Sequence, residues 1–489
     1  MLLNAKQIAE YTGGTVVVEA IDPSALLTGM TWDSREVTPR CLFVALPGER
    51  VNGHQFVPSA LRDGAGAVLV MDPLSDDVLT LAREMGAAVI EVASTFHALR
   101  DLAAEWRNHL RATVVAVTGS VGKTTTKNFV RNVSSRAGQV VATVANQNNE
   151  LGVPKTLLAA DPDTDIVVVE MGMRGLGQIA DSCELARPDW ALVTNVGECH
   201  VELLGSVDNV ARAKAEIYEA LPPGSGIAFI NESDSYAPFM LEVADLENRH
   251  IRCVGFAGVD GPEPLGLTPF NARVWAEDVE LDGEGRPRFS LCFSGFKDDP
   301  RTRKAACHLQ LQGLHNVANA CAAAAIGAQL GLEPEVIASA LADTIPEQGR
   351  QEILGAAAGY RVINDAYNAN PDSVRASLST FKALDVKGCR YAVLGDMFEL
   401  GPIAEECHRG VGRAAAHASL DYLICIGDLA RFIAEGALGE GLDAGRVLHF
   451  DSIGEVLAFL EPALEPDDVV LVKASHGMEL NRVVEGLVV

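Results

Sequence analysis

The stretch Ala116-Val117-Thr118-Gly119-Ser120-Val121-Gly122-Lys123-Thr124-Thr125-Thr126-Lys127 decides the fold predicted for the rest of the chain. The β-branched residues 113–115 precede it and predict a strand, and residues 128–133 after it predict a helix. A glycine-rich loop at this junction turns its backbone N–H groups inward, and the helix dipole adds partial positive charge. The stretch therefore predicts a phosphate-binding loop in an α/β fold.

The side chains of this loop predict that the phosphate belongs to ATP or GTP. Lys123 is expected to reach the β- and γ-phosphates, and the Thr124 hydroxyl is expected to ligate Mg²⁺. The generic pattern G-x-x-x-x-G-K-[ST] has glycine where this chain has Val117, so a glycine-rich turn with a surface lysine remains the alternative. The residues predicted to hold the nucleotide are Gly119, Ser120, Val121, Gly122, Lys123, Thr124 and Thr125.

Composition limits the class of protein. A chain of 489 residues is too long for one core, and about 150 residues per domain suggests about three domains. The net charge of −27 argues against a nucleic-acid or anionic-membrane surface, since such binding needs a basic face. The ten cysteines show no metal-ligand spacing, and no apolar run is long enough to span a membrane. We therefore expect a cytoplasmic protein with no nucleic-acid partner and no stable membrane insertion.

The order of predicted strands and helices gives an α/β protein of three domains. Residues 1–111 predict a small α/β domain, and residues 112–345 predict a parallel sheet around the phosphate loop. Residues 272–280 and 288–293 alternate apolar and polar side chains around Asp282-Gly283-Glu284-Gly285, which predicts an antiparallel hairpin at the edge of that sheet. Residues 346–489 repeat the strand–helix alternation without a phosphate loop and predict a Rossmann-like domain.

Two polar residues follow predicted strands of the central region and are candidate metal ligands. Glu170 ends the predicted strand 166–170, and His200 lies shortly after the predicted strand 190–195. Because the carboxyl ends of parallel strands meet at one edge of a sheet, both side chains are expected near the phosphate loop. The alternatives are a helix-capping carboxylate and a structural histidine.

Lys214 lies in the middle of an apolar stripe on the predicted helix 206–221. The stripe consists of Val207, Val210, Ile217 and Leu221. Burial of an unpaired ammonium is costly, so it lowers the pKa of the lysine and leaves a neutral amine that can react with CO₂. A carbamate would supply oxygen ligands for Mg²⁺, whereas the alternative is that Lys214 reaches a carboxylate such as Glu170 or Glu198.

Several segments together resemble the Mur ligases, in the order of that family and over nearly the whole chain. An amide-rich run, Asn146-Gln147-Asn148-Asn149, suits orientation of a substrate acyl group, although a polar helix cap is the alternative. The segments that carry the resemblance are residues 118–127, Asn146–Thr156, Gly313-Leu314-His315-Asn316-Val317-Ala318-Asn319-Ala320, Asn364-Asp365-Ala366-Tyr367-Asn368-Ala369-Asn370-Pro371 and Leu394-Gly395-Asp396-Met397-Phe398-Glu399-Leu400-Gly401.

The resemblance implies roles for further residues. His315 and Asn316 would lie at the nucleotide base, Arg350 would contact the γ-phosphate, and Asp365 would bind the ribose hydroxyls. The first domain would bind a UDP-sugar, and Lys214 would be carbamylated. The residues expected to contact the other substrates are Ser34, Arg35, Asn148, Asn149, Asn368 and Asn370. Arg40, Asn52 and Ala474 depart from the residues usual in the family, so the contact roles around them are less direct.

The activity implied by the resemblance is amide-bond formation in peptidoglycan precursor synthesis. ATP would phosphorylate a carboxylate of UDP-N-acetylmuramoyl-tripeptide, and the amine of D-alanyl-D-alanine would displace the phosphate, with Lys123, Lys214, His200, Arg350 and Mg²⁺ assisting. We expect a monomer. The alternatives are a sister ligase, a folylpolyglutamate-synthase-like enzyme, a P-loop NTPase that drives motion, and a binding protein without activity.

Overall fold

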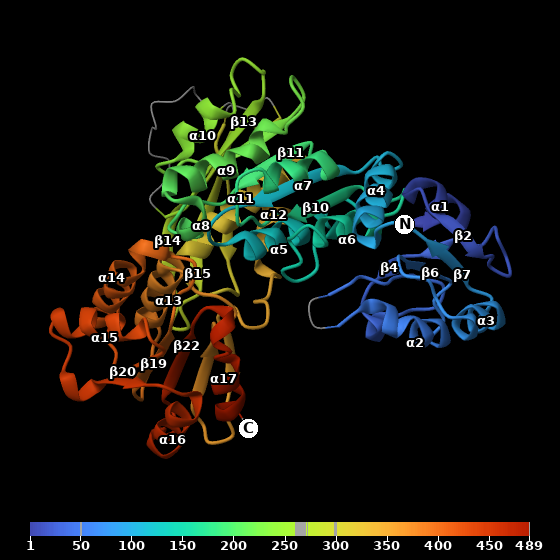
Figure 1. Ribbon diagram of the computed structural model, residues 1–489. Helices are drawn as coiled ribbons and strands as arrows, with labels where there is room; N and C mark the ends of the chain where they lie inside the picture. Colours follow the sequence, from blue (N-terminus) through green and yellow to red (C-terminus); the bar gives the residue numbers. More distant parts are fainter. Residues whose placement is uncertain (49–50, 260–269, 271, 298–300, 489) are drawn as a thin grey trace. The chain divides into compact units, whose positions relative to one another are not determined.

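The computed structural model describes residues 1–48, 51–259, 270, 272–297 and 301–488 (Figure 1). The chain divides into two compact units. Unit 1 comprises Met1–Ala116, Gly138–Gly172 and Ala180–Trp190, and unit 2 comprises Val117–Ala137, Met173–Ile179 and Ala191–Val489.

Unit 1 begins with a five-stranded sheet in the order β2-β7-β6-β5-β4. All neighbours in it are parallel except β2 and β7, and an antiparallel pair, β1 and β3, stands apart. The apolar side chains of β5, β6 and β7 are buried, so they form the core with the helices. The strands are β1 (Leu2–Leu3), β2 (Thr15–Val18), β3 (Leu27–Thr28), β4 (Met30–Thr31), β5 (Leu42–Val44), β6 (Ala67–Val70) and β7 (Ala88–Glu91), and the helices are α1 (Ala5–Thr12), η1 (Ser34–Glu36), η2 (Gly53–Phe56), α2 (Val57–Arg62), α3 (Asp76–Met85) and α4 (Thr95–Arg107).

The second part of unit 1 carries the parallel pair β10 (Ile166–Glu170) and β9 (Val140–Ala142), with α6 (Gly152–Ala159) between them in sequence. The Trp106 indole at the end of α4 donates a hydrogen bond to Ala160 O at 3.0 Å, which attaches the first part of the unit to the second. Three elements cross between the units along the chain: β8 (Thr113–Thr118), α7 (Gln178–Ala186) and β11 (Trp190–Val193).

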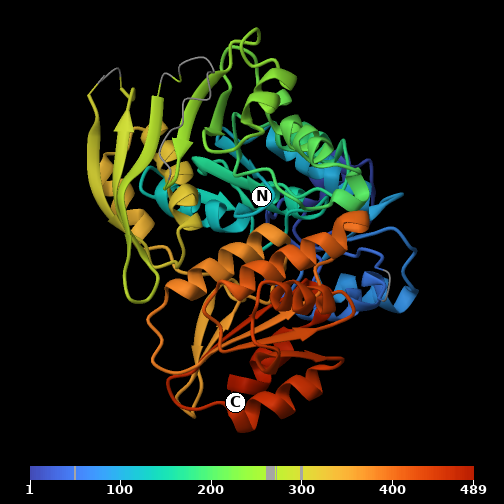
Figure 2. The same ribbon diagram turned by 90° about the vertical axis from the view of Figure 1, so that its left-hand side faces the viewer.

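The first part of unit 2 contains α5 and consecutive strands in the order β11-β12-β13-β14-β15-β16. The pairs β12–β13 and β13–β14 are parallel, whereas β14–β15 and β15–β16 are antiparallel, which Figure 2 shows as the long yellow strands. The strands are β11 (Trp190–Val193), β12 (Ile227–Asn231), β13 (Arg252–Ala257), β14 (Ala272–Leu281), β15 (Pro287–Ser294) and β16 (Arg303–His308), and the helices are α5 (Lys123–Ser134), α8 (Val201–Leu204), α9 (Val207–Glu219), α10 (Ala237–Val243), α11 (His315–Gln329) and α12 (Pro334–Ala342).

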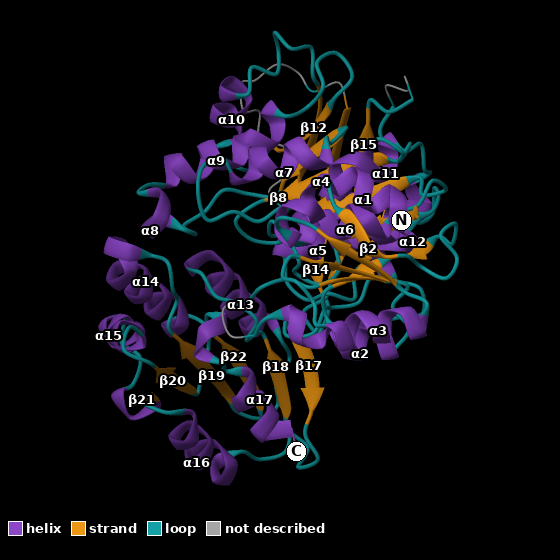
Figure 3. Ribbon diagram, turned by 45° about the vertical axis from the view of Figure 1, so that its right-hand side comes forward, coloured by secondary structure: helices purple, strands orange, loops and turns teal. Residues whose placement is uncertain are grey.

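The second part of unit 2 is a six-stranded sheet in the order β17-β18-β22-β19-β20-β21. Successive side chains of its parallel strands point to opposite faces, so both faces are apolar and both are covered by helices (Figure 3). The strands are β17 (Glu352–Gly355), β18 (Arg361–Asn364), β19 (Arg390–Gly395), β20 (Tyr422–Ile426), β21 (Val447–Phe450) and β22 (Val469–Lys473), and the helices are α13 (Pro371–Ala383), η3 (Gly401–Ile403), α14 (Ala404–Ala416), α15 (Ala430–Gly439), η4 (Ala444–Arg446), α16 (Ile453–Ala463), η5 (His476–Met478) and α17 (Asn481–Val488).

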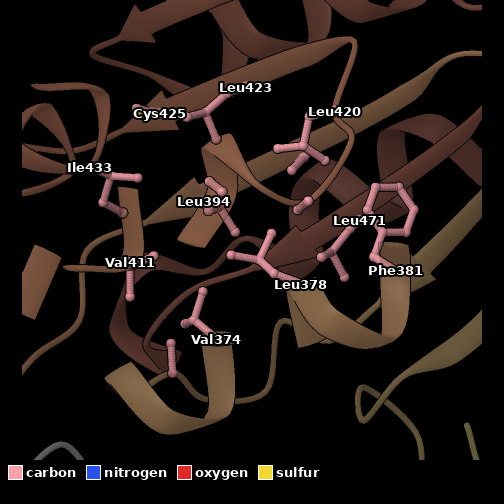
Figure 4. Packing of buried hydrophobic residues seen from close by; sticks show 14 of the residues in the cluster. Val374, Leu378, Phe381, Leu394, Val411, Leu420, Leu423, Cys425, Ile433 and Leu471 are labelled. Carbon is pink, nitrogen blue, oxygen red and sulfur yellow. The ribbon is translucent and has the colours of Figure 1, made fainter. Parts of the chain in front are cut away.

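Helices α13, α14 and α15 pack on one face of this sheet. Figure 4 shows Leu378 and Phe381 of α13 against Leu394 and Leu471 of the strands. Helices α16 and α17 pack on the other face through Leu460 and the apolar residues near Val483. The loops at the carboxyl ends of the strands therefore project from a rigid layer.

The predicted α/β fold is confirmed, including the antiparallel edge and the Rossmann-like C-terminal sheet. The strands that were not predicted are β1, β2, β3, β4, β7, β13, β16 and β17. None of the helices in the described parts of the chain has the length and apolar composition needed to cross a bilayer. The exact domain boundaries at residues 111 and 345 stay predictions.

Candidate active site

The loop between β8 and α5 packs so closely on its neighbours that two of its glycines have no room for a side chain. A Cβ on Gly119 would lie 1.8 Å from Thr194 Oγ1, and one on Gly122 would lie 2.6 Å from Asn319 Oδ1. Gly122 also has a φ of 83°, a left-handed conformation that glycine adopts without cost. The backbone of the loop is therefore held in one shape.

The N-terminus of α5 is open to a ligand. Its first residue follows Gly122, and no side chain in the described parts of the chain caps the helix. Lys123 Nζ donates to Gly119 O at 2.8 Å and to Ser120 O at 3.3 Å, so the ammonium lies across the loop. Uncapped N–H groups and a cation at a helix N-terminus form a phosphate site.

The segment after β11 holds this loop through hydrogen bonds. Asn195 Oδ1 accepts from Val121 N at 2.9 Å, and Asn195 Nδ2 donates to Val121 O at 2.9 Å. Gly197 N donates to Ser120 Oγ at 2.8 Å. The position of residues 195–200 is thereby tied to the phosphate loop.

His200, in this same segment, is paired with Glu399 from the turn after β19. His200 Nδ1 lies 2.5 Å from Glu399 Oε2, and the other carboxylate oxygen accepts from Arg174 Nε at 3.0 Å. Burial together with the nearby Lys123 ammonium lowers the pKa of His200, although Glu399 acts in the opposite direction. Burial acts to raise the pKa of Glu399, but the bonds from Arg174 and His200 hold it below its usual value.

Lys214 is buried in α9, as its apolar stripe predicted. Its exposed fraction is 1%, and burial lowers its pKa to about 8. No hydrogen bond or ion pair joins Lys214 to another residue within the described ranges. The Lys123 ammonium also lowers the pKa of Lys214, whereas Cys199 and Asp234 act to raise it.

The donor atoms of the predicted metal ligands decide whether Mg²⁺ fits them. Mg²⁺ prefers oxygen ligands, keeps several waters, and is bound by one or two protein groups plus substrate phosphates. The Thr124 hydroxyl and the Glu170 carboxylate are suitable, whereas imidazole nitrogen is better suited to transition metals. Among described residues, no group of three or more His, Cys, Asp and Glu side chains could hold a metal ion. The donors fit an ion held largely by nucleotide phosphates.

Helix α11 connects the predicted base-binding residues to α5. Asn319 Nδ2 donates to Asn316 Oδ1 at 3.0 Å, and Asn319 Oδ1 accepts from Thr126 Oγ1 at 3.1 Å. Asn316 in turn donates to Gln312 O at 2.7 Å. Burial lowers the pKa of His315 to about 4, so its imidazole is neutral at physiological pH.

Arg350 and Asp365 flank the start of the C-terminal sheet. The Arg350 guanidinium lies 4.3 Å from the centre of the Tyr367 ring. Asp365 Oδ2 accepts from Lys473 Nζ at 2.8 Å and from Ser377 Oγ at 2.5 Å. Both groups of the Asp365–Lys473 ion pair are buried, so this carboxylate has a fixed position.

The predicted substrate residues of unit 1 lie in two loops. Asn148 Nδ2 donates to Glu170 Oε1 at 2.7 Å, and Asn149 Oδ1 accepts from Gly152 N at 3.1 Å at the start of α6. The helix-cap alternative for the amide run therefore applies to Asn149. A substrate role for both residues stays a prediction.

Ser34 and Arg35 form the short helix η1. The Arg35 side chain is 87% exposed and its Nη2 lies 2.5 Å from Asp33 Oδ2. Lys155 of α6 lies 3.1 Å from Glu36 and 4.7 Å from the centre of the Trp32 ring, so this loop is attached to α6 within unit 1.

Asn368 and Asn370 lie before α13. Asn370 Oδ1 caps that helix by accepting from Ser373 N at 2.8 Å, and Asn368 is exposed, with its backbone oxygen accepting from Lys473 Nζ at 2.9 Å. Their substrate roles also stay predictions.

Unit 2 brings Lys123, His200, Lys214 and their partners into one neighbourhood. Sequence reasoning missed Glu399, Arg174 and Asn319 as members of it. The signal for Glu399 was its place in the segment Leu394–Gly401, which resembles a family motif. Nothing in the sequence indicated its partner, because Glu399 and His200 are 199 residues apart.

Known protein families match three consecutive parts of this chain. The chain matches the Mur ligase family, catalytic domain, over residues 26–107, the Mur ligase middle domain over residues 117–327, and the Mur ligase, glutamate ligase domain, over residues 349–476. It is 34% identical to the UDP-N-acetylmuramoyl-tripeptide–D-alanyl-D-alanine ligase of Bacillus subtilis (strain 168), covering 99% of this chain and 98% of that protein. The enzyme of the same name from Escherichia coli (strain K12) is also 34% identical, covering 94% of each chain.

Solved structures show the same relationship. MurF from Acinetobacter baumannii has a TM-score of 0.80 and 29% identity, covering 100% of this chain and 99% of that one. MurF ligase from Thermotoga maritima, solved in complex with ADP, has a TM-score of 0.70 and 26% identity, covering 94% and 96% of the two chains. The three domain matches, the full-length identity and the fold together establish that this chain belongs to the Mur ligase family.

Proposed function

We propose that this chain is an ATP-dependent ligase that joins D-alanyl-D-alanine to UDP-N-acetylmuramoyl-tripeptide, with release of ADP and phosphate. The observation that carries the proposal is similarity over the full length to enzymes of that name, since 98% of the Bacillus subtilis protein is covered. The uncapped N-terminus of α5 with Lys123 beside it supports the use of ATP.

The first chemical step is transfer of the γ-phosphoryl group to the substrate carboxylate. Such a transfer depends mainly on positioning and on neutralisation of charge. Lys123 would exchange its two carbonyl acceptors in the loop for phosphate oxygens. Arg350, which has no ion-pair partner among the described residues, would contact the γ-phosphate. Asp365 Oδ1 would accept from the ribose hydroxyls, and His315 and Asn316 would lie at the base.

The second step is attack of the dipeptide amine on the acyl phosphate. The amine forms a bond to the carbonyl carbon, and the phosphate leaves with the bonding electrons. The amide-bearing residues Asn148 and Asn149 would orient the tripeptide, Asn368 and Asn370 would orient the dipeptide, and Ser34 and Arg35 would bind the uridine diphosphate. Exclusion of water from the acyl phosphate protects it from hydrolysis.

Mg²⁺ would be held by the nucleotide phosphates together with the oxygen ligands of Thr124, Glu170 and a carbamylated Lys214, and His200 would be the one nitrogen ligand, the donor least suited to this ion. When bound, the ion neutralises charge on the phosphate oxygens. We propose that Lys214 carries a carbamate, because the buried amine, with a pKa near 8 and without a described partner, is available to react with CO₂. The carbamate converts a cation into an oxygen donor.

The place of the reaction is proposed to be the cytoplasm, because all ten cysteines are free and eight of them are buried, as expected in a reducing compartment. We also propose that the three segments 1–111, 112–345 and 346–489 divide the work. The first binds the UDP-sugar, the second ATP, and the third the dipeptide and part of the nucleotide.

Phosphate release from ATP tests this function directly. The purified chain is assayed with UDP-muramoyl tripeptide or with muramoyl peptides that lack UDP. Each is combined with D-alanyl-D-alanine or with a single amino acid such as glutamate. The expected result is release that requires both the tripeptide and D-alanyl-D-alanine, with a new amide product of the summed mass less water. Faster release with a single amino acid, or with muramoyl peptides that lack UDP, would contradict the assignment.

A further inference from the structure

The carboxylate of Glu399 connects two loops that come from other parts of unit 2. Its Oε2 lies 2.5 Å from His200 Nδ1 in the segment after β11. Its Oε1 accepts from Arg174 Nε at 3.0 Å, and Arg174 Nη2 bonds to the same oxygen. The backbone adds a third link, because Glu202 N donates to Glu399 O at 3.2 Å. Both oxygens of this side chain are therefore engaged by named donors.

The backbone at both ends of the His200–Glu399 bond is in an uncommon conformation. Glu399 has a φ of 61° and His200 a φ of 56°, which is the left-handed region. A non-glycine residue is rarely found there, and such residues persist where the surroundings hold them. Two paired residues in this conformation indicate that the bond is held in place by the turns that carry it.

Hydrogen bonds from the C-terminal sheet fix the turn that carries Glu399. Met397 N donates to His408 Nε2 at 2.9 Å, and Phe398 N donates to Ser475 Oγ at 2.9 Å. The imidazole of His408 is fully buried and its Nδ1 lies 2.7 Å from Ala404 O. The residues directly before Glu399 are thus held by α14 and by the loop after β22.

The other side of the bond is fixed to the phosphate loop. The segment that carries His200 bonds to Ser120 through Gly197 N at 2.8 Å and to Val121 through Asn195. His200 also begins α8, where its carbonyl accepts from Leu204 N at 3.1 Å. The segment that carries His200 therefore joins the phosphate loop to the turn after β19.

We infer that Glu399 is a positioning residue that sets the tautomer and the orientation of His200. A carboxylate only accepts hydrogen bonds, so His200 Nδ1 must be the donor, and Nε2 is left for the nucleotide site. Histidines that bind metals usually donate their second N–H to a carboxylate in this way, and loss of that partner costs about 10- to 100-fold in affinity or activity.

The alternative is that Glu399 only joins two parts of unit 2 as an ion pair. A second link between the same parts provides the matched control. Arg375 of α13 lies 3.1 Å from Glu198 and 2.9 Å from Asp372, and its side chain is 39% exposed. It joins the segment after β11 to the C-terminal region but does not touch the imidazole of His200.

The test compares Glu399→Ala and Glu399→Met with Arg375→Ala. The protein is labelled with [¹⁵N]histidine, the His200 signal is assigned by its loss in His200→Asn, and the imidazole ¹⁵N shifts are recorded without substrates. The wild type and Arg375→Ala are expected to show the proton on Nδ1. Glu399→Ala is expected to move it toward Nε2. If Glu399→Ala does not fold, Glu399→Met, which keeps the length of the side chain but has no oxygen acceptor, gives the same comparison.

Kinetics supply the second measurement, which rests on the proposed function. The Glu399 variants are expected to lower kcat about 10- to 100-fold and to raise the Mg²⁺ concentration for half-maximal rate, with less change in the KM for D-alanyl-D-alanine. An unchanged tautomer in both Glu399 variants, or equal effects of Arg375→Ala and Glu399→Ala on tautomer and kcat, would overturn the inference. The absence of any ligation would contradict the proposed function alone, because the tautomer is measured without substrates.

Discussion

At the scale of single residues, Lys123 is the group whose loss should matter most. Lys123→Ala removes a preorganised cation from the transferring phosphate, and deletion of one such donor costs on the order of 10²–10³ in rate. We expect kcat to fall by this factor while the circular dichroism spectrum stays the same. Lys382→Ala, which changes an exposed lysine of α13, is the control. Retention of more than a tenth of the wild-type rate would refute the phosphate-loop assignment.

Substitutions of Lys214 distinguish whether this residue acts as a cation or, as a carbamate, as a metal ligand. If the residue acts as a carbamate, Lys214→Arg keeps a cation but loses the oxygen ligands, so its rate should fall roughly 100-fold, as for loss of one transition-state group. Lys214→Ala should fall similarly and recover in part when short-chain carboxylic acids are added. Near-normal activity of Lys214→Arg would show that charge alone suffices.

At the scale of secondary-structure elements, α11 should control how α5 presents the phosphate loop. Asn319→Ala removes the bonds to Thr126 and Asn316, and one net hydrogen bond contributes about 1 kcal/mol. We expect the KM for ATP to rise roughly 5- to 10-fold, with little change in the KM for the dipeptide. Asn248→Ala, which removes an exposed bond to Asp245, is the control. Equal increases in both Michaelis constants would indicate a general loss of structure instead.

The ion pair between β12 and β14 predicts a dependence of stability on pH. Glu232 is 1% exposed and lies 3.0 Å from Arg273, and burial raises its pKa to about 7, although Arg273 acts to lower it. The folded state therefore binds the proton more tightly than the unfolded state, where the pKa is near 4.5. The resulting stabilisation is complete below pH 4.5 and is lost as the pH rises to about 7.

Glu232→Gln should remove this dependence, because the amide stays neutral at every pH. The midpoint of thermal unfolding of the variant, relative to wild type, should rise between pH 5 and pH 8. The corresponding change in the free energy of unfolding has an upper limit on the order of 3 kcal/mol, at about 1.4 kcal/mol per pKa unit. Glu84→Gln, at an exposed position of α3, is the control for removal of one charge. Parallel curves for Glu232→Gln and wild type would contradict the expectation.

The same scale shows what the sequence could predict. The strand predicted at 166–170 is found with the same bounds, because it is a short apolar run that is buried on both faces of the sheet. The strand β16, Arg303–His308, has no apolar run and is held by pairing with β15, which a local pattern cannot reveal. The role of Asn149 could not be assigned from the sequence, because an amide side chain serves equally well as a helix cap and as a substrate contact.

The sequence predicts the surroundings of a candidate site residue when they come from one contiguous segment. It does not predict contacts between segments that are far apart in the chain. The position of Lys123 at the start of a helix that follows a strand and a glycine loop is as predicted, because these three elements are contiguous in the sequence. Lys214 was predicted to be buried because it lies on the same helix face as its apolar neighbours. It is 1% exposed. Glu399 and Arg174 were missed, because ion pairs between side chains 225 residues apart depend on the tertiary fold.

At the scale of the whole molecule, charge should keep the chain monomeric. A net charge of −27 on a protein of 51.8 kDa produces repulsion between copies. We expect sedimentation equilibrium at 0.15 M salt to give the mass of one chain over a tenfold range of concentration. A mass twice as large that does not change on dilution would show a stable dimer.

One buried thiol lies in the segment after β11 and another in α14, and together they offer a chemical measure of the separation of these two segments. Cys199 Sγ lies 3.0 Å from Ser120 Oγ, and Cys407 Sγ lies 3.9 Å from Glu198 Oε2. Both thiols are buried, and burial raises the pKa of Cys407 to about 11, so an alkylating reagent reacts slowly in the closed arrangement. Separation of the segment after β11 from α14 exposes both sulfurs to solvent. The rate at which iodoacetamide adds mass at these two positions therefore reports how often the segments part, and ATP should slow the addition at Cys199.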